Sequence, residues 1–343
     1  MSGKLKIKIL HLDGDEPDVR KQITNVTSSQ LKRLIGDYKI IMIDEAQMIN
    51  NIGLTIKLIV DKVKNVQVIA TGSSSLDLAN EINAPLTGRK AEYMLFPLSV
   101  GEMVKHHGEL EESRMLESRL LYGMYPEVVT NQGKERAILK SLSGSYLYKD
   151  IFAFQDIRKP AIIQNLLEAL ALQIGSEVSV FEIAKTLRID SVTVERYIKL
   201  LEQAFIIFSL RSFSRNVRTE LKKSRKIYFY DNGIRNAIIA NFNPLSLRQD
   251  KGALWENFLV SERQKYIHYK NIFTNSYFWR TTQQQEIDYI EDFDGRLYTY
   301  EFKWTGRQNI RFPKTFISAY PDSSFTVISQ ENYLDFLSKP LIK

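Results

Sequence analysis

The amino-acid sequence predicts an α/β protein of several domains, and two patterns carry this prediction. In the first hundred residues, short apolar strands alternate with helical patterns, which is typical of a parallel sheet with right-handed crossovers. Near the C-terminus, strand patterns flank Asp294-Gly295, a strong two-residue hairpin signal. We expect strands at 1–12, 40–43, 66–70, 93–98, 277–280, 286–292 and 297–304. We expect helices at 27–35, 52–64, 76–83, 111–122, 134–154, 160–174, 181–187, 191–205 and 255–266.

The composition bounds the class of protein. The chain has 343 residues, enough for two or three domains, and 44% of them are hydrophobic, which is ordinary for a folded globular protein. It has no cysteine, which excludes disulfides and thiolate metal sites and is typical of a cytoplasmic protein. No apolar run approaches the length of a membrane helix, so we expect no membrane partner. The net charge of +7 weakly favours an anionic partner.

The expected strand at 40–43 ends in two carboxylates, Asp44 and Glu45. Its four consecutive apolar residues suit a strand that is buried on both faces. In P-loop ATPases this arrangement is the Walker B motif, in which the aspartate holds Mg²⁺ and the adjacent glutamate polarises the attacking water. A buried strand that ends in a solvated acidic turn would explain the same residues, so the neighbouring motifs decide between the two interpretations.

Polar residues follow the next expected strand, at 71–75. In ATPases of the additional-strand type, a polar residue at this place senses the γ-phosphate, and Ser73 or Thr71 is the candidate. A serine here would also suit a helix N-cap. Arg89 precedes the expected strand at 93–98, and in a ring or dimer an arginine there reaches a neighbour's nucleotide as an arginine finger. Taken alone, such an arginine is more often a surface residue.

Three segments, in this order and spacing, closely resemble a group of prokaryotic AAA-like (AAA+) P-loop ATPases: IIMIDEAQMI, VIATGSSSLDLAN and PLTGRKAEYMLFPLS. Residues 123–127 and 148–151 match the segment after the ATPase in that group. The resemblance implies a partial AAA-like ATPase core at 1–100, followed by a C-terminal domain of uncharacterised function. It also implies ATP and Mg²⁺ as cofactors. The ATPase residues that it implies are Asp44, Glu45, Ser73 and Arg89.

The phosphate-binding Walker A loop, G-x-x-x-x-G-K-[ST], occurs nowhere in the sequence. Its backbone amides cradle the phosphates and its lysine neutralises them. In the family's sheet the strand before this loop lies between the third and last strands expected here, so its loss would leave unpaired edges. We therefore expect a family member shortened at its N-terminus that does not hydrolyse ATP alone. It is either a gene remnant or is completed by a protein that supplies the missing segment.

A mostly helical connector is expected at 101–159 and a winged helix at 160–235. Two helices around a short turn at 188–190 have helix-turn-helix proportions, and the exposed face of the second has mixed charge. The segment 211–226 is more basic, and as a wing lying on phosphates it would contact DNA. A solvated loop, or a surface for another domain, would explain it too. Its basic residues are Arg211, Arg215, Arg218, Lys222, Lys223, Arg225 and Lys226.

The C-terminal hairpin turn fixes which residues oppose each other. With Asp294-Gly295 as the turn, counting outward places Asp288 opposite Glu301. The same register places Glu286 opposite Lys303. Opposed Cβ atoms lie roughly 5 Å apart, close enough for two carboxylates to share one divalent ion.

This layout resembles the PD-(D/E)XK nuclease superfamily, which implies a restriction-endonuclease-like α/β domain at 250–343. In that superfamily the two acids, here Asp288 and Glu301, bind Mg²⁺, and the lysine, here Lys303, orients or activates the water. Glu256, in the preceding helix, matches an additional metal-binding acid. A plain cross-strand ion pair would explain part of the pattern, and a shared fold does not establish the chemistry.

The sequence leaves three functions open. The first is an ATP-binding protein of the AAA-like family. The second is a Mg²⁺-dependent nuclease that acts through the C-terminal domain. The third is a non-catalytic scaffold that binds DNA or protein and in which both sites are relics. Nucleotide binding, Mg²⁺-dependent cleavage that Lys303→Ala abolishes, and salt-sensitive DNA binding with neither activity would distinguish the three.

Overall fold

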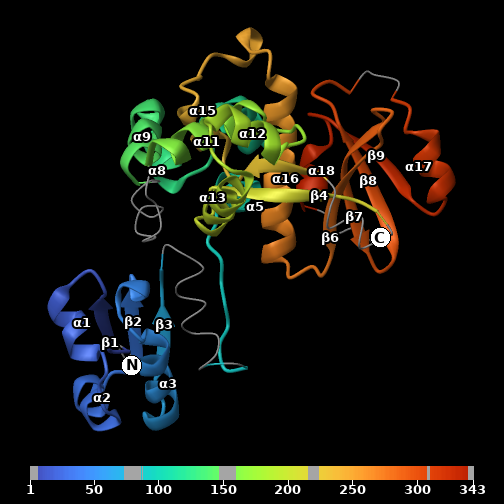
Figure 1. The fold of residues 1–343 in the computed structure, drawn as a ribbon. Coiled ribbons are helices and arrows are strands. Elements are labelled where there is room, and N and C mark those ends of the chain that lie inside the picture. Colours follow the sequence, from blue (N-terminus) through green and yellow to red (C-terminus); the bar gives the residue numbers. More distant parts are fainter. Residues whose placement is uncertain are drawn as a thin grey trace. The chain divides into compact units, whose positions relative to one another are not determined.

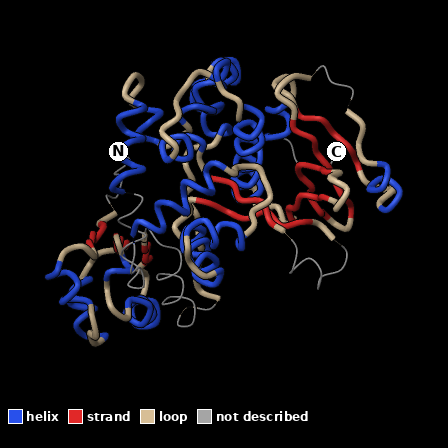
Figure 2. Tube along the Cα trace, turned by 45° about the horizontal axis from the view of Figure 1, so that its top comes forward, coloured by secondary structure: helices blue, strands red, loops and turns tan. Residues whose placement is uncertain are grey.

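A computed structural model of the chain divides into two compact units, Met1–Met94 and Leu95–Lys343. It describes residues 7–72, 86, 88–146, 160–214, 224–306 and 310–338. Figure 1 labels the helices and strands, and Figure 2 separates them by colour. No helix in the described ranges has the length and hydropathy that a membrane span requires.

The N-terminal unit contains a three-stranded parallel sheet in the order β1-β2-β3. This is the expected parallel arrangement of the first three strands. The elements of the unit are β1 (Ile9–Asp13), α1 (Pro17–Ile23), α2 (Ser28–Ile35), β2 (Ile40–Asp44), the 3₁₀ turn η1 (Ala46–Met48), α3 (Ile52–Lys62) and β3 (Gln67–Ala70).

Strand β2 is covered unequally on its two faces, whereas its sequence predicts burial on both. Ile41 and Ile43 are fully buried in a core that α2 and α3 share with the sheet. Ile40 and Met42, on the other face, are only half-buried. Ile69 of β3 is the register partner of Met42 and is 40% exposed. In the part of this unit that the structure describes, one face of the sheet therefore keeps apolar surface.

Two segments within residues 1–98 differ from what the sequence predicts. The expected strand at 93–98 is wrong, because these residues have no strand pairing and Tyr93 and Leu95 are about 90% exposed. An apolar run becomes a strand only where a neighbour accepts its backbone hydrogen bonds. The short helix α1 was missed, although Pro17 at its first position and Asp18 in its first turn are typical start signals.

The second unit is built around a mixed six-stranded sheet in the order β5-β4-β6-β7-β8-β9, in which β4 runs parallel to β6 and β8 to β9. Its first helices are α5 (Val100–His107), α6 (Glu109–Arg114), α7 (Leu116–Tyr122), α8 (Pro126–Thr130), α9 (Glu135–Ser141) and the π-helical turn η2 (Leu142–Tyr146). Next come α11 (Pro160–Leu172), α12 (Val180–Leu187), α13 (Ser191–Gln203), β4 (Ile207–Ser212), β5 (Arg225–Phe229), α15 (Asn232–Ile238) and the 3₁₀ turn η3 (Leu245–Leu247). The last are α16 (Lys251–Tyr269), β6 (Asn275–Arg280), β7 (Glu286–Phe293), β8 (Arg296–Phe302), α17 (Lys314–Ala319), β9 (Ser324–Ile328) and α18 (Tyr333–Ser338).

The helices α11, α12 and α13 share one hydrophobic core with β4 and β5. These two strands lie in the range expected for the winged helix, but β4 also pairs with β6. The sheet therefore continues from one expected domain into the next. The long helix α16 packs in a second core with β7 and β8, where Trp255 is fully buried.

The hairpin between β7 and β8 confirms the predicted turn. Asp294 and Gly295 both have positive φ angles, 50° and 79°, as a type I′ turn requires. The register runs as expected from the pair Phe293–Arg296 inward to the pair Tyr289–Tyr300. This register positions the acids that β7 and β8 carry.

Candidate functional site

The carboxyl edge of the three-stranded sheet brings together polar side chains from neighbouring strands. Asp44 is the last residue of β2 and is exposed. The hydroxyl of Thr71, which follows β3, donates to Oδ1 of Asp44, and the N–H of Glu45 donates to the same oxygen at 3.2 Å. Asp13 ends β1 and lies opposite Asp44 in register. This is the edge at which open α/β sheets bind their ligands.

Glu45 continues the chain in a left-handed conformation, with φ 43° and ψ 44°, which non-glycine residues rarely adopt. The N–H of Gly14 donates to the carbonyl oxygen of Asp44 at 2.8 Å. A Cβ at Gly14 would lie 2.3 Å from the carbonyl oxygen of Glu45, so this close approach requires glycine. The carboxylate of Glu45 accepts a hydrogen bond from Nε2 of Gln47 at 2.5 Å, which orients it.

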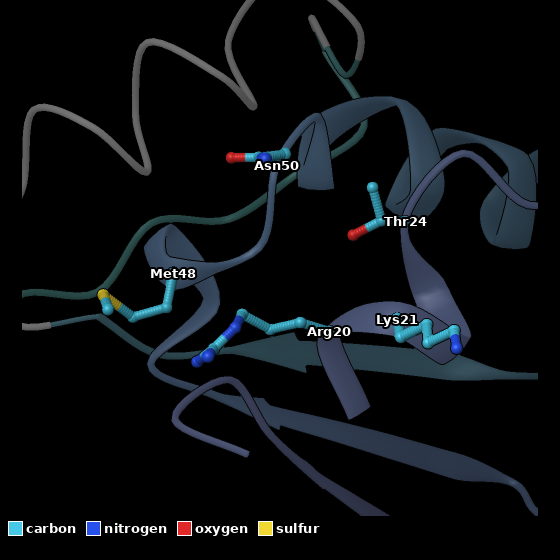
Figure 3. Close-up of a pocket in the computed structure, with 5 residues that line it drawn as sticks. All are labelled: Arg20, Lys21, Thr24, Met48 and Asn50. Atoms are coloured by element: carbon cyan, nitrogen blue, oxygen red, sulfur yellow. The ribbon is translucent and has the colours of Figure 1, made fainter. Parts of the chain in front are cut away.

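A pocket of about 400 Å³ lies in the same unit. The residues that line it are Arg20, Lys21, Thr24, Met48 and Asn50. Figure 3 shows the side chain of Arg20 reaching toward Met48, whereas Lys21 points away from it. Nη1 of Arg20 donates to the carbonyl oxygens of Gly14 and Asp15 at 2.7 and 2.9 Å. The arginine therefore fixes the loop after β1, the loop that approaches Glu45.

The other two predicted ATPase residues have different outcomes. Ser73 lies outside the described residues, and Thr71, the alternative to it, contacts Asp44. Arg89 forms an ion pair with Asp61 of α3, within its own unit. Its expected role in a neighbour's nucleotide site stays a prediction.

In the second unit, the structure brings Asp288, Glu301 and Lys303 together. Oδ2 of Asp288 accepts a hydrogen bond from the N–H of Phe302 at 2.8 Å, just beyond the last ladder pair of β7 and β8. Nζ of Lys303 lies 3.1 Å from Oε2 of Glu301, which is itself buried. The paired strands therefore end one residue before the expected pair Asp288–Glu301, and the contact of Asp288 with the N–H of Phe302 keeps its carboxylate beside β8.

Glu286 is not opposite Lys303, because the ladder between β7 and β8 ends before it. On the other side of β7, Glu286 pairs in register with Arg280 of β6. Its carboxylate lies 2.6 Å from Nζ of Lys226, a lysine on β5. The simple cross-strand ion pair considered for Glu286 and Lys303 is therefore wrong.

Lys226 also contacts Glu256, so that it joins α16, β5 and β7. Its Nζ lies 2.9 Å from Oε1 of Glu256, and its side chain is 1% exposed. The hydroxyl of Tyr228 donates to the same oxygen of Glu256 at 2.6 Å. Sequence reasoning missed both Lys226 and Tyr228 as members of this site. The sequence offered one signal for Lys226: it begins the apolar run KIYFY, and the strand formed by this run has few exposed positions.

The buried position of Lys226 contradicts one part of the prediction that segment 211–226 contacts DNA. Lys226 is buried and cannot lie on phosphates. Arg225 forms an ion pair with Glu195 of α13 at 2.8 Å, while Arg211 is exposed. Residues 215–223 of the segment lie outside the described residues.

Burial and charge shift the pKa values at the C-terminal site. Burial raises the pKa of Glu256 to about 7, against the attraction of Lys226 and with added repulsion from Asp288. Burial likewise raises the pKa of Asp288 to about 7, with added repulsion from Glu301. Burial lowers the pKa of Lys226, but the attraction of Glu256, Asp288 and Glu286 outweighs it and the pKa is raised. Lys226 therefore keeps its positive charge, while Glu256 and Asp288 lose their protons at a higher pH than free carboxyl groups do.

The C-terminal acids do not fit the Mg²⁺ that the nuclease resemblance implies. In the ranges that the structure describes, no group of three or more histidine, aspartate and glutamate side chains is arranged to hold a metal ion. Each of the three acids that the resemblance implies already has a partner: Oε1 of Glu256 is bound by Lys226 and Tyr228, Oδ2 of Asp288 accepts from the N–H of Phe302, and Oε2 of Glu301 is bound by Lys303. We therefore derive no metal-dependent step at this site.

Comparison with protein families divides the chain into three parts. Residues 2–104 match a family described as an AAA domain, which confirms the predicted AAA domain. Residues 113–246 and 251–336 match two families described as domains of unknown function, DUF8612 and DUF4143. The chain therefore consists of an AAA domain followed by two domains of unknown function.

Similar proteins occur in bacteria and archaea. An uncharacterized protein of Mycobacterium tuberculosis is 27% identical over 282 residues, 81% of this chain and 61% of that protein. An uncharacterized protein of Methanocaldococcus jannaschii is 25% identical over 296 residues, 79% of this chain and 64% of that protein. The chain thus spans about three fifths of the length of these curated relatives. A crystal structure of a Vibrio cholerae protein, 12% identical, aligns over 96% of both chains with a TM-score of 0.19, too low to support an argument.

Proposed function

We propose that the AAA domain of this chain contributes the residues of an ATPase site that bind Mg²⁺ and orient the attacking water. We propose further that the phosphate-binding loop of this site comes from outside these 343 residues. The observation that carries the proposal is the polar edge after β2 and β3, where Thr71 donates to Asp44 and Glu45 follows directly. Mg²⁺ on a nucleotide is commonly held by one or two carboxylates together with water and phosphate oxygens. Asp13 and Asp44, opposite each other in register, fit that donor set.

The residues of this edge then have distinct tasks. A bound magnesium nucleotide supplies the phosphoryl group and the cation that neutralises it. Asp44, fixed by the Thr71 hydroxyl and the Glu45 N–H, would hold the hydrated ion through its carboxylate oxygens. Glu45, oriented by Gln47, would accept a hydrogen bond from the attacking water.

The outer edge of β3 supports a position for the missing segment next to this strand. Among the strands that the structure describes, β3 pairs with β2 alone. Ile69 of β3 and Met42 of β2 leave apolar surface on one face of the sheet. A strand edge with unpaired backbone N–H and C=O groups favours pairing with a further strand, and the apolar face would be covered by the helix that follows it. We propose that the strand that precedes the phosphate-binding loop pairs there.

The test begins with the DNA on the 5′ side of the Met1 codon, where the proposal expects a segment that encodes a strand, a G-x-x-x-x-G-K-[ST] loop and a helix. Fluorescent ATP analogues and Mg²⁺ are then titrated against the chain with and without that segment. Binding is expected only with the segment, and Asp44→Asn is expected to weaken its magnesium dependence. Tight binding by the 343 residues alone would contradict the proposal.

A second candidate function is nucleic-acid binding through α13, and one ion pair favours it. Arg196 and Lys199 are exposed on this helix, and the acid beside them, Glu195, is paired with Arg225. That pairing makes the exposed face of α13 more positive than its sequence indicates. Phosphate contacts by arginine and lysine supply most non-specific affinity for DNA, so salt-sensitive binding of a duplex tests this candidate.

A further inference from the structure

The acidic cluster of the second unit, Glu256, Glu286, Asp288 and Glu301, contains a lysine in the place of a bound cation. Nζ of Lys226 lies 2.9 Å from Glu256 and 2.6 Å from Glu286. The two carboxylates come from α16 and β7, and the lysine from β5. Each of these three elements is distant from the others in the sequence, so the fold itself assembles this charge cluster.

Lys226 is held in place through both its backbone and its side chain. On β5 its backbone pairs in register with Leu210 of β4 and forms an isolated β-bridge to Glu177. Nζ lies 5.4 Å from the ring centroid of Phe278, within the range of a cation–π contact. The side chain of Lys226 is 1% exposed, and turning it to solvent would break its ion pairs with both Glu256 and Glu286.

A divalent ion on the same two carboxylates would need nearly the same place. Mg²⁺ binds oxygen at about 2.1 Å, and Nζ of Lys226 already lies within 3 Å of an oxygen of Glu256 and of Glu286. An ion that coordinated both oxygens would therefore lie beside the ammonium, and two positive charges at that separation repel strongly in a buried site. Two acids of the cluster remain, Asp288 and Glu301. Nζ of Lys303 lies 3.1 Å from Oε2 of Glu301, and Asp288 lies close enough to Lys226 and Lys303 for both to attract its charged form.

We infer that Lys226 is the built-in cation of this cluster, so that the wild-type cluster binds no divalent metal and the C-terminal unit is not a metal-dependent nuclease. The acids then connect α16, β5 and β7 through the lysine and do not act on a substrate. This inference is independent of the ATPase proposal, which concerns the other unit.

The test counts bound Mn²⁺ on the full chain by electron paramagnetic resonance. Four proteins are compared: wild type, Asp288→Asn, Lys226→Ala and Lys226→Ala/Asp288→Asn. Any Mn²⁺ that the AAA domain binds is common to all four. Wild type and Asp288→Asn are expected to bind equally, Lys226→Ala is expected to bind one more equivalent, and the double variant is expected to lose it.

Two results would overturn the inference. One is a wild-type chain that binds one equivalent more than Asp288→Asn, because the cluster would then already hold a metal. The other is a folded Lys226→Ala chain that gains no Mn²⁺. Tryptophan fluorescence monitors folding, because all three tryptophans, Trp255, Trp279 and Trp304, lie in the second unit. If Lys226→Ala does not fold, the comparison of wild type with Asp288→Asn decides alone.

Discussion

The ammonium of Lys226 on β5 lies 2.6 Å from the carboxylate of Glu286 on β7, although β4 and β6 stand between these strands in the sheet order. Lys226 belongs to the residues that match one domain of unknown function, and Glu286 to those that match the next. The ion pair therefore crosses the boundary between two family matches. Together with the pairing of β4 and β6, it makes one structural unit of both.

The acidic cluster around Lys226 predicts that the free energy of unfolding depends on pH. Burial and repulsion from Glu301 raise the pKa of Asp288 to about 7. Between about pH 4 and pH 7 the folded state therefore keeps a proton that the unfolded chain has lost, so stability falls as the pH rises through this window. The asparagine of the Asp288→Asn variant cannot titrate, so the free energy of unfolding of this variant is expected to decrease less with pH. Urea unfolding followed by tryptophan fluorescence at several pH values measures the slope.

A matched control for that prediction is Asp322→Asn, because Asp322 is exposed and outside the cluster. This variant is expected to keep the wild-type slope. Equal slopes for wild type and Asp288→Asn would show that Asp288 has no raised pKa in the folded state.

The turn at Gly123 predicts a strongly destabilising substitution. Gly123 has a φ of +69°, and a Cβ there would lie 2.0 Å from Oδ1 of Asp231. That buried carboxylate accepts hydrogen bonds from the N–H groups of Met124 at 2.7 Å and Ile234 at 3.0 Å, so it cannot move without leaving donors unpaired. Gly123→Ala is expected to lower the free energy of unfolding by roughly 2–5 kcal/mol, measured by urea denaturation.

Gly133→Ala is the control for the steric part of this effect. Gly133 also has a positive φ, +85°, but a Cβ added there would meet nothing within 4 Å. Backbone strain alone is expected to cost about 1–2 kcal/mol at this position. Equal losses at Gly123 and Gly133 would mean that the contact with Asp231 does not determine the cost.

Local chemistry explains which features were predictable from the sequence. Asp294-Gly295 dictates a hairpin by its own backbone preference, and the register of the two strands follows from it. The position of Asp44 at the end of β2 was predictable because a run of apolar residues that suits a strand stops directly before it. The partner of Glu286 was not predictable, because Lys226 reaches it only through the pairing of β4 with β6, two strands distant in sequence.

The exposed face of α13 predicts a measurable effect on nucleic-acid binding. If Arg196 and Lys199 contact phosphates, Arg196→Ala/Lys199→Ala lowers the affinity for any duplex sequence. The slope of log affinity against log salt is expected to change by about 0.9 for each contact removed. Fluorescence anisotropy of a labelled duplex at several salt concentrations measures both quantities.

The control for this effect is Lys134→Ala/Lys140→Ala, which removes the same charge from exposed positions elsewhere in the unit. It is expected to leave the salt slope unchanged. The same loss of affinity in both double variants would indicate a general charge effect and would count against α13 as the contact surface.

The most direct test of the ATPase proposal is phosphate release from ATP and Mg²⁺, measured for this chain alone and for the chain completed with a strand–phosphate-loop–helix segment. The account predicts background rates for the chain alone and turnover for the completed protein. It further predicts that Asp44→Asn lowers that turnover on the order of 100-fold or more, because a correctly held metal is worth several kcal/mol. Turnover by the 343 residues alone that Asp44→Asn abolishes, or turnover of the completed protein that is unaffected by Asp44→Asn, would contradict the account.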